Sequence, residues 1–537
     1  MCGFIGTVTA KTGSKLSHRG PDAVGAFSGA IPWANVSLEM TRLAIVDRKP
    51  INVPFDFRES CGVVLAFNGE VYNWRSLRAE LSDGTPWQTD CDAEVVARVW
   101  RRWGAGMLDR MNGMWGLALV DEREGVVFLA RDRAGEKPLY YAALGSGIAF
   151  ASEIKALPIK LEEGPCAELE TLEFDCLETT PFQSVRCLGP GEYMIFRSPG
   201  DLALQKTTKW WKLPILELCE DWGEAVEEVQ ETLVDAVKIR ATCEVPVAVQ
   251  LSGGLDSAII QAIVRSERLY TVTFPEVDNL TLARPAAFGV AEPKAITFDY
   301  EDLLKALPKI AYHLDTPATW TAVCQWFMDK QIALDGAVVV LSGEGADELF
   351  GGYSRYRFLW WLERMKLRDA NLAAYGPMGE KLFGGDDEML AKMLNRGGST
   401  TLGHAQELVK RFAMGKDLVE QAGRLDFYTT MQVLLRMADR MAAAFSLENR
   451  SPFLDYRLME LSVRMPTRWK VTESYSKAVL REVAEHLKVP RAIIYDKTKK
   501  GLFLPWSKWK GVAGERGVWD RSSFAKVMRE AWREAFF

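Results

Sequence analysis

The chain has 537 residues, which exceeds the roughly 250 to 300 residues at which a single hydrophobic core stops growing, so at least two domains are expected. Its composition, 48% hydrophobic and 26% charged, is typical of globular proteins and excludes a disordered or collagen-like chain. A net charge of -6 provides no basic face, so nucleic acid is excluded as a main partner.

The apolar runs are too short for a membrane protein. None reaches the roughly 18 residues that a membrane-spanning helix needs, and the longest are strand-sized, such as residues 336–341. Nine cysteines and the lack of an apolar leader favour a reducing compartment over a disulfide framework. We therefore expect a cytoplasmic protein with no membrane partner.

Short apolar runs separated by polar turns dominate residues 1–199 and predict β-hairpins, for example at residues 61–70 and 114–132. Helical spacing interrupts them at residues 73–81 and 92–103, so sheets and helices are expected in packed layers. A polar stretch near residues 197–214 predicts a linker. We expect an N-terminal α/β domain over residues 1–205 and a second domain over residues 206–537.

The second half alternates helical and strand patterns. A helix is predicted from residue 226 to 237, buried strands at 245–251, 269–274 and 337–341, and a helix after residue 257. This alternation indicates a parallel sheet with helices on its faces, whose ligands bind at the carboxyl ends of the strands. From about residue 353 the chain is expected to be mainly helical, and its amphipathic last segment to pack on its own domain.

Cys2 follows the initiator Met1 directly. Removal of Met1 would give one residue both a thiol nucleophile and an α-amino group that can act as general base. An incidental buried cysteine is the alternative that position alone leaves open.

The string LSGGLDS, residues 251–257, lies where a predicted strand ends and a helix begins. Backbone N–H groups and a helix N-terminus at such a junction can hold a phosphate, and a plain turn is the alternative. The chain contains no GxxxxGK[ST] or GxGxxG string, which argues against a γ-phosphate kinase and a dinucleotide fold.

Five sequence strings follow one another in the first half: MCGFIG at the start, HRGPD from His18, TRLAIVD from Thr41, FNGEVYN from Phe67 and CDAEVV from Cys91. In these strings the chain resembles the class II glutamine amidotransferases, and in their order the glutamine-hydrolysing asparagine synthetase family. The resemblance implies an N-terminal nucleophile (Ntn) type of layered α/β glutaminase domain with Cys2 as nucleophile.

The same resemblance implies roles for other residues. Arg42 would clamp the glutamine carboxylate through its planar guanidinium. Asn68 and the Gly69 N–H would form an oxyanion hole, with Glu70 and Asp92 receiving the α-ammonium. His18 is left out as a loop histidine. The implied glutamine-binding set is Arg42, Ile45, Val46, Asn68, Gly69, Glu70 and Asp92.

SGGLDS resembles the pyrophosphate loop of ATP pyrophosphatases, and LSGEGADELFGGY, residues 341–353, resembles the asparagine synthetase family. The second domain is therefore expected to be an ATP-pyrophosphatase-like synthetase with a helical extension. ATP is implied as substrate and Mg²⁺ as cofactor, since hard oxygen ligands from Asp256 and Asp347 suit that ion. The implied ATP-binding set is Leu251, Ser252, Gly253, Gly254, Leu255, Asp256, Ser257, Val272, Ser342 and Gly343.

Glu344 and Lys477 are implied as catalytic residues beside the acyl-adenylate. Lys477 would neutralise phosphate charge, and Glu344 would assist proton removal from ammonia. The resemblance extends over residues 434–466, where Asp439, Arg450 and Asp455 are expected to form a structural network beside the site.

Residues 274–341 depart from the pattern of a housekeeping asparagine synthetase, which weakens the assignment of the acceptor acid. Residues 314–327 are a plausible specificity segment there, although an aromatic cluster explains Trp320, Trp326 and Phe327 equally well.

The predicted reaction consumes glutamine, ATP and a carboxylic acid, and releases an amide, glutamate, AMP and pyrophosphate. Aspartate is the leading acceptor and a specialised metabolite the second. An intramolecular amide-forming cyclase and a non-enzymatic scaffold with a relict fold are the rivals. Intact Cys2, Arg42, Asn68 and Asp92 argue against the cyclase. The sequence leaves a homodimer open.

Overall fold

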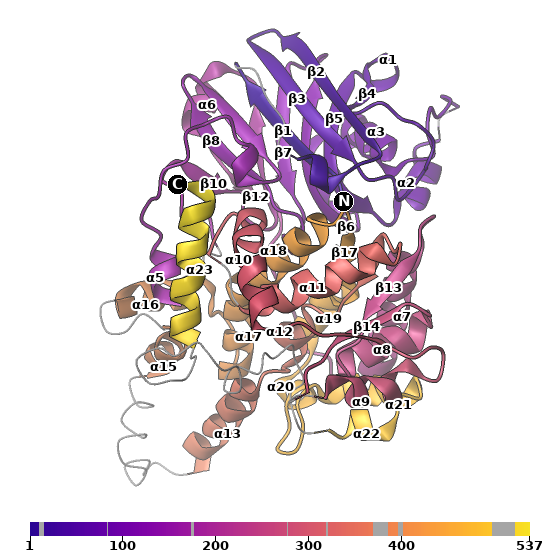
Figure 1. Ribbon diagram of the computed structural model, residues 1–537, viewed down its shortest axis with the longest axis vertical. Helices are drawn as coiled ribbons and strands as arrows, with labels where there is room; N and C mark the ends of the chain where they lie inside the picture. The colour runs from indigo at the N-terminus through magenta and orange to yellow at the C-terminus, as the bar shows by residue number, and fades with distance from the viewer. Residues whose placement is uncertain are drawn as a thin grey trace.

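The structure is a computed structural model that describes residues 1–9, 16–82, 84–172, 177–275, 278–317, 320–368, 385–395, 401–496 and 521–537. Figure 1 shows an upper region of stacked sheets above a region richer in helices, with the N-terminus at their junction. The predicted α/β class and the mixed antiparallel and parallel sheets are confirmed.

Two antiparallel sheets form the N-terminal region, each with six strands within the described residues. The first has the order β10 (Val185–Cys187), β8 (Tyr140–Leu144), β9 (Gly147–Ala151), β1 (Gly3–Val8), β3 (Ala34–Arg42) and β2 (Ala23–Ile31). The second has the order β12 (Thr208–Lys209), β11 (Glu192–Phe196), β7 (Val126–Arg131), β6 (Gly113–Asp121), β5 (Val63–Val71) and β4 (Phe55–Phe57).

Short helices complete this region: η1 (Ser17–Arg19), α1 (Arg58–Cys61), α2 (Trp74–Glu80), α3 (Asp92–Trp103), η2 (Gly104–Gly106), α4 (Met107–Arg110), η3 (Ile154–Ala156), α5 (Ala167–Leu172) and α6 (Pro199–Leu204). Strand β7 is buried along its whole length, whereas β2 alternates exposed and half-buried residues until its last position. Strand β5 is likewise almost wholly buried, because the first sheet covers one of its faces and α3 the other.

A five-stranded parallel sheet organises the second region, in the order β15 (Lys294–Ile296), β14 (Leu269–Val272), β13 (Val247–Gln250), β16 (Val339–Leu341) and β17 (Glu448–Arg450). The chain leaves β13 toward β14 on one side and later returns to β16 on the other. The strand order therefore reverses between β13 and β16, where open parallel sheets bind their ligands.

The remaining helices surround this sheet. They are α7 (Trp222–Ala241), α8 (Leu255–Val264), α9 (Asn279–Ala283), η4 (Arg284–Ala287), α10 (Tyr300–Leu314), α11 (Trp320–Leu334), α12 (Ala346–Phe350), α13 (Ser354–Arg368), α15 (Gly385–Leu394), α16 (Leu402–Phe412), α17 (Leu418–Tyr428), α18 (Thr430–Ala443), η7 (Pro452–Leu454), α19 (Tyr456–Arg464), α20 (Thr467–Lys470), α21 (Ala478–His486), α22 (Arg491–Ile494) and α23 (Arg521–Phe536). No helix within the described ranges has the length and apolar character needed to cross a membrane.

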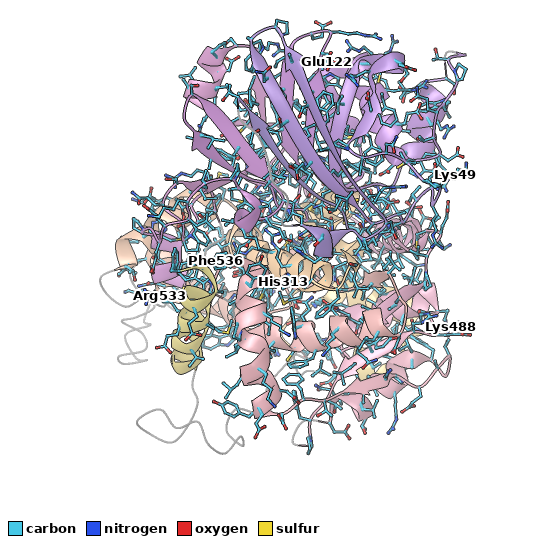
Figure 2. The ribbon with its side chains drawn as sticks, turned by 45° about the horizontal axis from the view of Figure 1, so that its top comes forward. Lys49, Glu122, His313, Lys488, Arg533 and Phe536 are labelled. Carbon is cyan, nitrogen blue, oxygen red and sulfur yellow. The ribbon has the colours of Figure 1, made fainter. Side chains whose placement is uncertain are left out.

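The last helix, α23, contacts both regions rather than only its own. It packs along α10, while Trp532 lies edge-on to Phe182 of the N-terminal region with ring centroids 5.4 Å apart. Arg533 forms an ion pair with Glu163 at 2.8 Å, and Figure 2 labels Arg533 and Phe536 on this helix. The amphipathic pattern predicted the apolar face but not that part of its partner comes from the first 200 residues of the chain.

Candidate active sites

Cys2 lies just before β1, where the first sheet meets the second region. Its sulfur lies 3.8 Å from the Leu43 carbonyl oxygen, and Arg19 Nε donates to the Cys2 carbonyl at 2.9 Å. A Cβ at Gly3 would come within 2.7 Å of Arg19 Cδ, so only glycine fits beneath this arginine. Met1 is fully buried, and burial lowers the pKa of its α-amino group to about 5 while it raises the pKa of the Cys2 thiol.

Asn68 and Gly69 lie near the end of β5. The Asn68 side chain is fully buried, yet neither its amide nitrogen nor its amide oxygen has a hydrogen-bond partner among the described residues. Gly69 has φ +150°, and a Cβ there would lie 2.0 Å from the Met114 carbonyl oxygen. An unpaired buried amide is costly, which is the condition expected of a donor that awaits a ligand.

Arg42 ends β3 and shapes the loop after it. Its guanidinium donates to the carbonyl oxygens of Val46 at 3.2 Å and Lys49 at 3.0 Å. The Ile45 carbonyl in the same loop accepts from Glu244 N at 3.3 Å, which ties the loop to the second region. Arg42 therefore organises the predicted Ile45–Val46 segment in this structure.

Two buried carboxylates, Glu70 in β5 and Asp92 at the start of α3, belong to the predicted glutamine-binding set. Asp92 begins α3 and accepts from Val71 N at 2.9 Å, whereas Glu70 pairs with Arg450 at 2.6 Å. Burial raises the pKa of Glu70 to about 8 and that of Asp92 to about 6. A cationic ligand group would offset the burial of two like charges.

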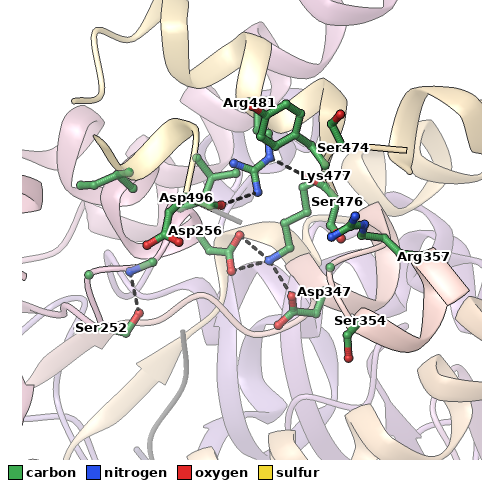
Figure 3. Close-up of a pocket in the computed structure, with 16 residues that line it drawn as sticks. Ser252, Asp256, Asp347, Ser354, Arg357, Ser474, Ser476, Lys477, Arg481 and Asp496 are labelled. Atoms are coloured by element: carbon green, nitrogen blue, oxygen red, sulfur yellow. Dashed lines mark hydrogen bonds and ion pairs between the residues drawn. The ribbon is translucent and has the colours of Figure 1, made fainter. Parts of the chain in front are cut away.

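The second site is a pocket at the carboxyl ends of β13 and β16 (Figure 3). Lys477 Nζ lies 2.6 Å from Asp256 Oδ2 and 2.6 Å from Asp347 Oδ1, so the two predicted metal ligands converge on one point. Although burial disfavours its charge, the two carboxylates raise the pKa of Lys477 above its ordinary value.

The loop after β13 forms one wall of this pocket. Gly253 has φ +74°, and a Cβ there would lie 2.7 Å from the Leu282 backbone, so the tight turn requires glycine. Ser252 Oγ accepts from Gly254 N at 3.2 Å, which fixes the turn before α8 begins at Leu255. The N-terminus of α8 thus faces the pocket, as the phosphate-binding prediction requires.

Not every predicted ATP residue lines the pocket. Ser252, Gly253, Gly254, Leu255 and Asp256 do, together with the predicted metal ligand Asp347 and the predicted catalytic residue Lys477. The other members of the predicted ATP-binding set do not line it: Ser257 lies in the first turn of α8, and Leu251, Val272, Ser342 and Gly343 lie at or just after strand ends. Glu344, a predicted catalytic residue, does not line it either.

Arg357 and Arg481 also line the pocket and were missed by the sequence analysis. Arg481 lies one helical turn after Lys477 and donates to the carbonyl oxygens of Ser476 at 2.7 Å and Asp496 at 3.2 Å. Its i+4 spacing within YSKAVLRE could have predicted it, because residues four apart share a helix face.

Strand β17 connects the two sites. Arg450 reaches the N-terminal region through Glu70, while its carbonyl oxygen accepts from Ser342 N at 3.2 Å. Asn449 points to the opposite face of the strand and accepts from Ser342 Oγ at 2.9 Å. One three-residue strand therefore touches both the predicted glutamine site and the loop after β16.

Asp439 and Asp455 also lie at this interface. Arg19 donates to Asp439 at 2.9 Å, and Asn112 Nδ2 donates to Asp455 at 3.0 Å. With Arg450 they form a network between the two regions. The sequence analysis expected all three to form a structural network beside the ATP site.

Comparison with known proteins finds two family models in this chain. The model described as asparagine synthase matches residues 228–526, and the glutamine amidotransferase domain model matches residues 1–211. Asparagine synthetase [glutamine-hydrolyzing] 1 of Bacillus subtilis (strain 168) is 28% identical, over 99% of this chain and 91% of its own length.

Two further relatives agree with these matches. Asparagine synthetase [glutamine-hydrolyzing] 3 of Bacillus subtilis (strain 168) is 28% identical over 90% of this chain and 82% of its own length. Asparagine synthetase B [glutamine-hydrolyzing] of Escherichia coli (strain K12) is 31% identical over 63% of this chain and 60% of its own length.

Proposed function

This chain belongs to the asparagine synthase family, and we propose that its first half releases ammonia from glutamine while its second half activates a carboxylic acid as an acyl-adenylate. It is a carbon–nitrogen ligase, and its amidation depends on glutamine and ATP. The sequence-based boundary was 205/206, but β12 (Thr208–Lys209) still pairs with β11 of the N-terminal region, so we assign the glutaminase to residues 1–209 and the synthetase to the residues that follow. The separate antiparallel and parallel sheets carry this division, and the contact of β17 with both sites joins the two halves.

In the glutaminase half, the Cys2 thiolate attacks the glutamine amide carbon and forms a thioester as ammonia leaves. After Met1 is removed, the α-amino group of Cys2 would lie beside its own thiol and could take the thiol proton. Asn68 and the Gly69 N–H stabilise the oxyanion. Arg42 holds the substrate carboxylate, and Asp92 with Glu70 holds its ammonium group.

In the synthetase half, the acceptor carboxylate displaces pyrophosphate from ATP, and ammonia then displaces AMP. Two carboxylates that converge in a pocket, completed by phosphate oxygens, are a donor set that suits Mg²⁺. Asp256 and Asp347 would hold the ion, which when bound neutralises phosphate charge. The protein would supply only these two ligands, since the described residues contain no group of three or more His, Cys, Asp or Glu that could hold a metal. Lys477 adds a positive charge at the same place.

We propose aspartate as the acceptor, with the product asparagine. The names of the relatives support this choice, and the departure at residues 274–341 leaves a different small carboxylic acid as the second candidate.

The test is AMP release by the purified enzyme with ATP, Mg²⁺, glutamine and one carboxylic acid at a time. Aspartate should support the formation of AMP, pyrophosphate and glutamate in equal amounts. ADP and phosphate as products would contradict the adenylate, and activity with another acid alone would replace aspartate.

A further inference from the structure

Arg450 is a fully buried arginine of β17, and it belongs to the synthetase half although it reaches the predicted glutamine site. Its Nη2 donates to Glu70 Oε2 at 2.6 Å. Within the described residues this is the one hydrogen bond that the Glu70 side chain makes, so the other carboxylate oxygen, Oε1, stays available to a ligand. A residue of the second half therefore holds one oxygen of a carboxylate that belongs to the first half.

The three nitrogens of the Arg450 guanidinium each have a separate partner. Nε donates to Glu448 Oε1 at 2.9 Å within the same strand, and Nη1 donates to the Arg240 carbonyl oxygen at 2.7 Å near the end of α7. A planar guanidinium that is held at three points cannot rotate without breaking a hydrogen bond. The direction in which Nη2 meets Glu70 is therefore fixed by β17 and α7, which both lie outside the glutaminase half.

The charge of Arg450 acts on Glu70 as well as its direction. Burial raises the pKa of Glu70 to about 8, Asp92 and Glu448 add to this increase, and Arg450 is the group that opposes it most. A protonated carboxylic acid attracts an ammonium group far less than a carboxylate does. Arg450 therefore favours the ionised form of Glu70, which is the form that the α-ammonium group of glutamine requires.

We propose that Arg450 is a positioning residue of the glutaminase, which orients Glu70 so that its second oxygen receives the α-ammonium group of glutamine. This inference rests on the glutamine-binding role proposed for Glu70. It goes beyond that role, because the glutamine site is then incomplete within residues 1–209. Since the Arg450 carbonyl oxygen also accepts from Ser342 N at 3.2 Å, the same residue joins glutamine recognition to the loop after β16.

A purely structural role at the interface is the alternative, and Arg240 provides the comparison. Arg240 is buried as completely as Arg450, and its side chain donates to Asp455 at 2.9 Å and to the Ala236 carbonyl oxygen rather than to Glu70. The loss of either arginine leaves a buried carboxylate without its counter-charge. Only the loss of Arg450 should also weaken the binding of glutamine.

The test measures glutamine binding by titration calorimetry in Cys2→Ala protein, which should bind glutamine without cleaving it. Arg450→Met should raise the dissociation constant by roughly 10- to 100-fold, as expected when a charged hydrogen-bond partner is removed. Arg450→Lys keeps the charge but not the planar fork, so its dissociation constant should lie between those of Arg450→Met and of the protein that retains Arg450. Arg240→Met is the matched control, and it should lower the unfolding temperature but leave the dissociation constant unchanged.

A double-mutant cycle with Glu70→Gln shows whether Arg450 acts through Glu70. Glu70→Gln keeps an acceptor oxygen for Arg450 but loses the negative charge, so it should weaken glutamine binding by itself. In that background Arg450→Met should weaken binding no further. If Arg450→Met does not fold, Arg450→Lys takes its place in the same cycle.

An equal loss of glutamine affinity in Arg240→Met would overturn the positioning role, and so would a full additional effect of the Arg450 substitution in the Glu70→Gln background. Unchanged affinity in the folded Arg450 variants would overturn it as well. If Cys2→Ala protein bound no glutamine, or if Glu70→Gln bound it normally, the proposed glutamine site itself would be contradicted, which is a separate failure.

Discussion

Two buried carboxylates at the interface between the two regions, Asp439 and Asp455, are paired with arginines, whereas some buried polar groups elsewhere have no hydrogen-bond partner. Asp439 accepts from Arg19 at 2.9 Å, and Asp455 pairs with Arg240 at 2.9 Å. By contrast, the Asn68 amide has no hydrogen-bond partner within the described residues. The difference separates groups that hold the fold together from groups that are kept for a substrate.

The largest effect is expected for Lys477, which is paired in this structure but should act on phosphate during the reaction. Lys477→Ala should lower ammonium-dependent amide synthesis by on the order of 10³-fold, because its charge stabilises the transition state. ATP affinity, measured by calorimetry, should change far less. Lys160→Ala, at an exposed site, is the charge control. A loss of ATP affinity as large as the loss of rate would make Lys477 a ground-state contact.

Removing a partner from the interface should cost stability rather than chemistry. Asp455→Ala leaves the buried Arg240 without its counter-charge and should lower the free energy of unfolding by about 3–5 kcal/mol, measured by urea denaturation. Asp235→Ala removes a half-exposed partner of Arg457 and should cost less than about 1 kcal/mol. Equal losses in the two variants would mean that the interface network adds nothing beyond surface pairing.

Asn68 should show the opposite behaviour. Asn68→Ala should lower glutaminase kcat by about 10² to 10³-fold, with little loss of stability, because it removes an oxyanion donor and no hydrogen bond. The readout is glutamate release, with thermal unfolding alongside. Asn73→Ala is the matched control, since its side chain is paired with Arg110 and Asn112 and should affect stability instead. Normal kcat in Asn68→Ala would remove it from the catalytic group.

The smallest expected effect is on the pH dependence of folding stability. Although burial opposes its charge, Arg240 and Arg457 hold the pKa of Asp455 well below its ordinary value. A carboxylate with a depressed pKa stabilises the fold fully above its unfolded pKa of about 3.9, and this contribution is lost as pH falls toward the folded value. Unfolding midpoints of wild type and Asp455→Asn should therefore converge below pH 4. If the difference between the two unfolding midpoints stayed constant down to pH 2, protonation of Asp455 would not be coupled to unfolding.

Much of the fold could be predicted from local pattern. The helix predicted at residues 92–103 matches α3, and the apolar run at 245–251 contains β13. Strands β15 (KAI) and β17 (ENR) were missed because neither lies in a continuous apolar run, unlike the equally short β16. The pairing of β17 with β16, more than 100 residues earlier in the chain, is a tertiary contact that no local pattern encodes.

The candidate sites were predicted unevenly for the same reason. Glycine-rich strand-end loops mark the ATP pocket directly, so Asp256 and Asp347 could be named in advance. The pairing of Arg450 with Glu70 depends on how the two regions dock, which composition and spacing do not determine.

The central claim is that one chain holds two separable chemistries, and Cys2→Ala tests it most directly. The measurement is amide formation with either glutamine or ammonium as the sole nitrogen source, at the same ATP and acceptor concentrations. The variant should lose glutamine-dependent synthesis and keep the wild-type rate with ammonium, because Cys2 lies outside the pocket formed by Asp256, Asp347 and Lys477. Glutamine-dependent synthesis that survives in Cys2→Ala would contradict the nucleophile, and loss of both activities would show that Cys2 is structural.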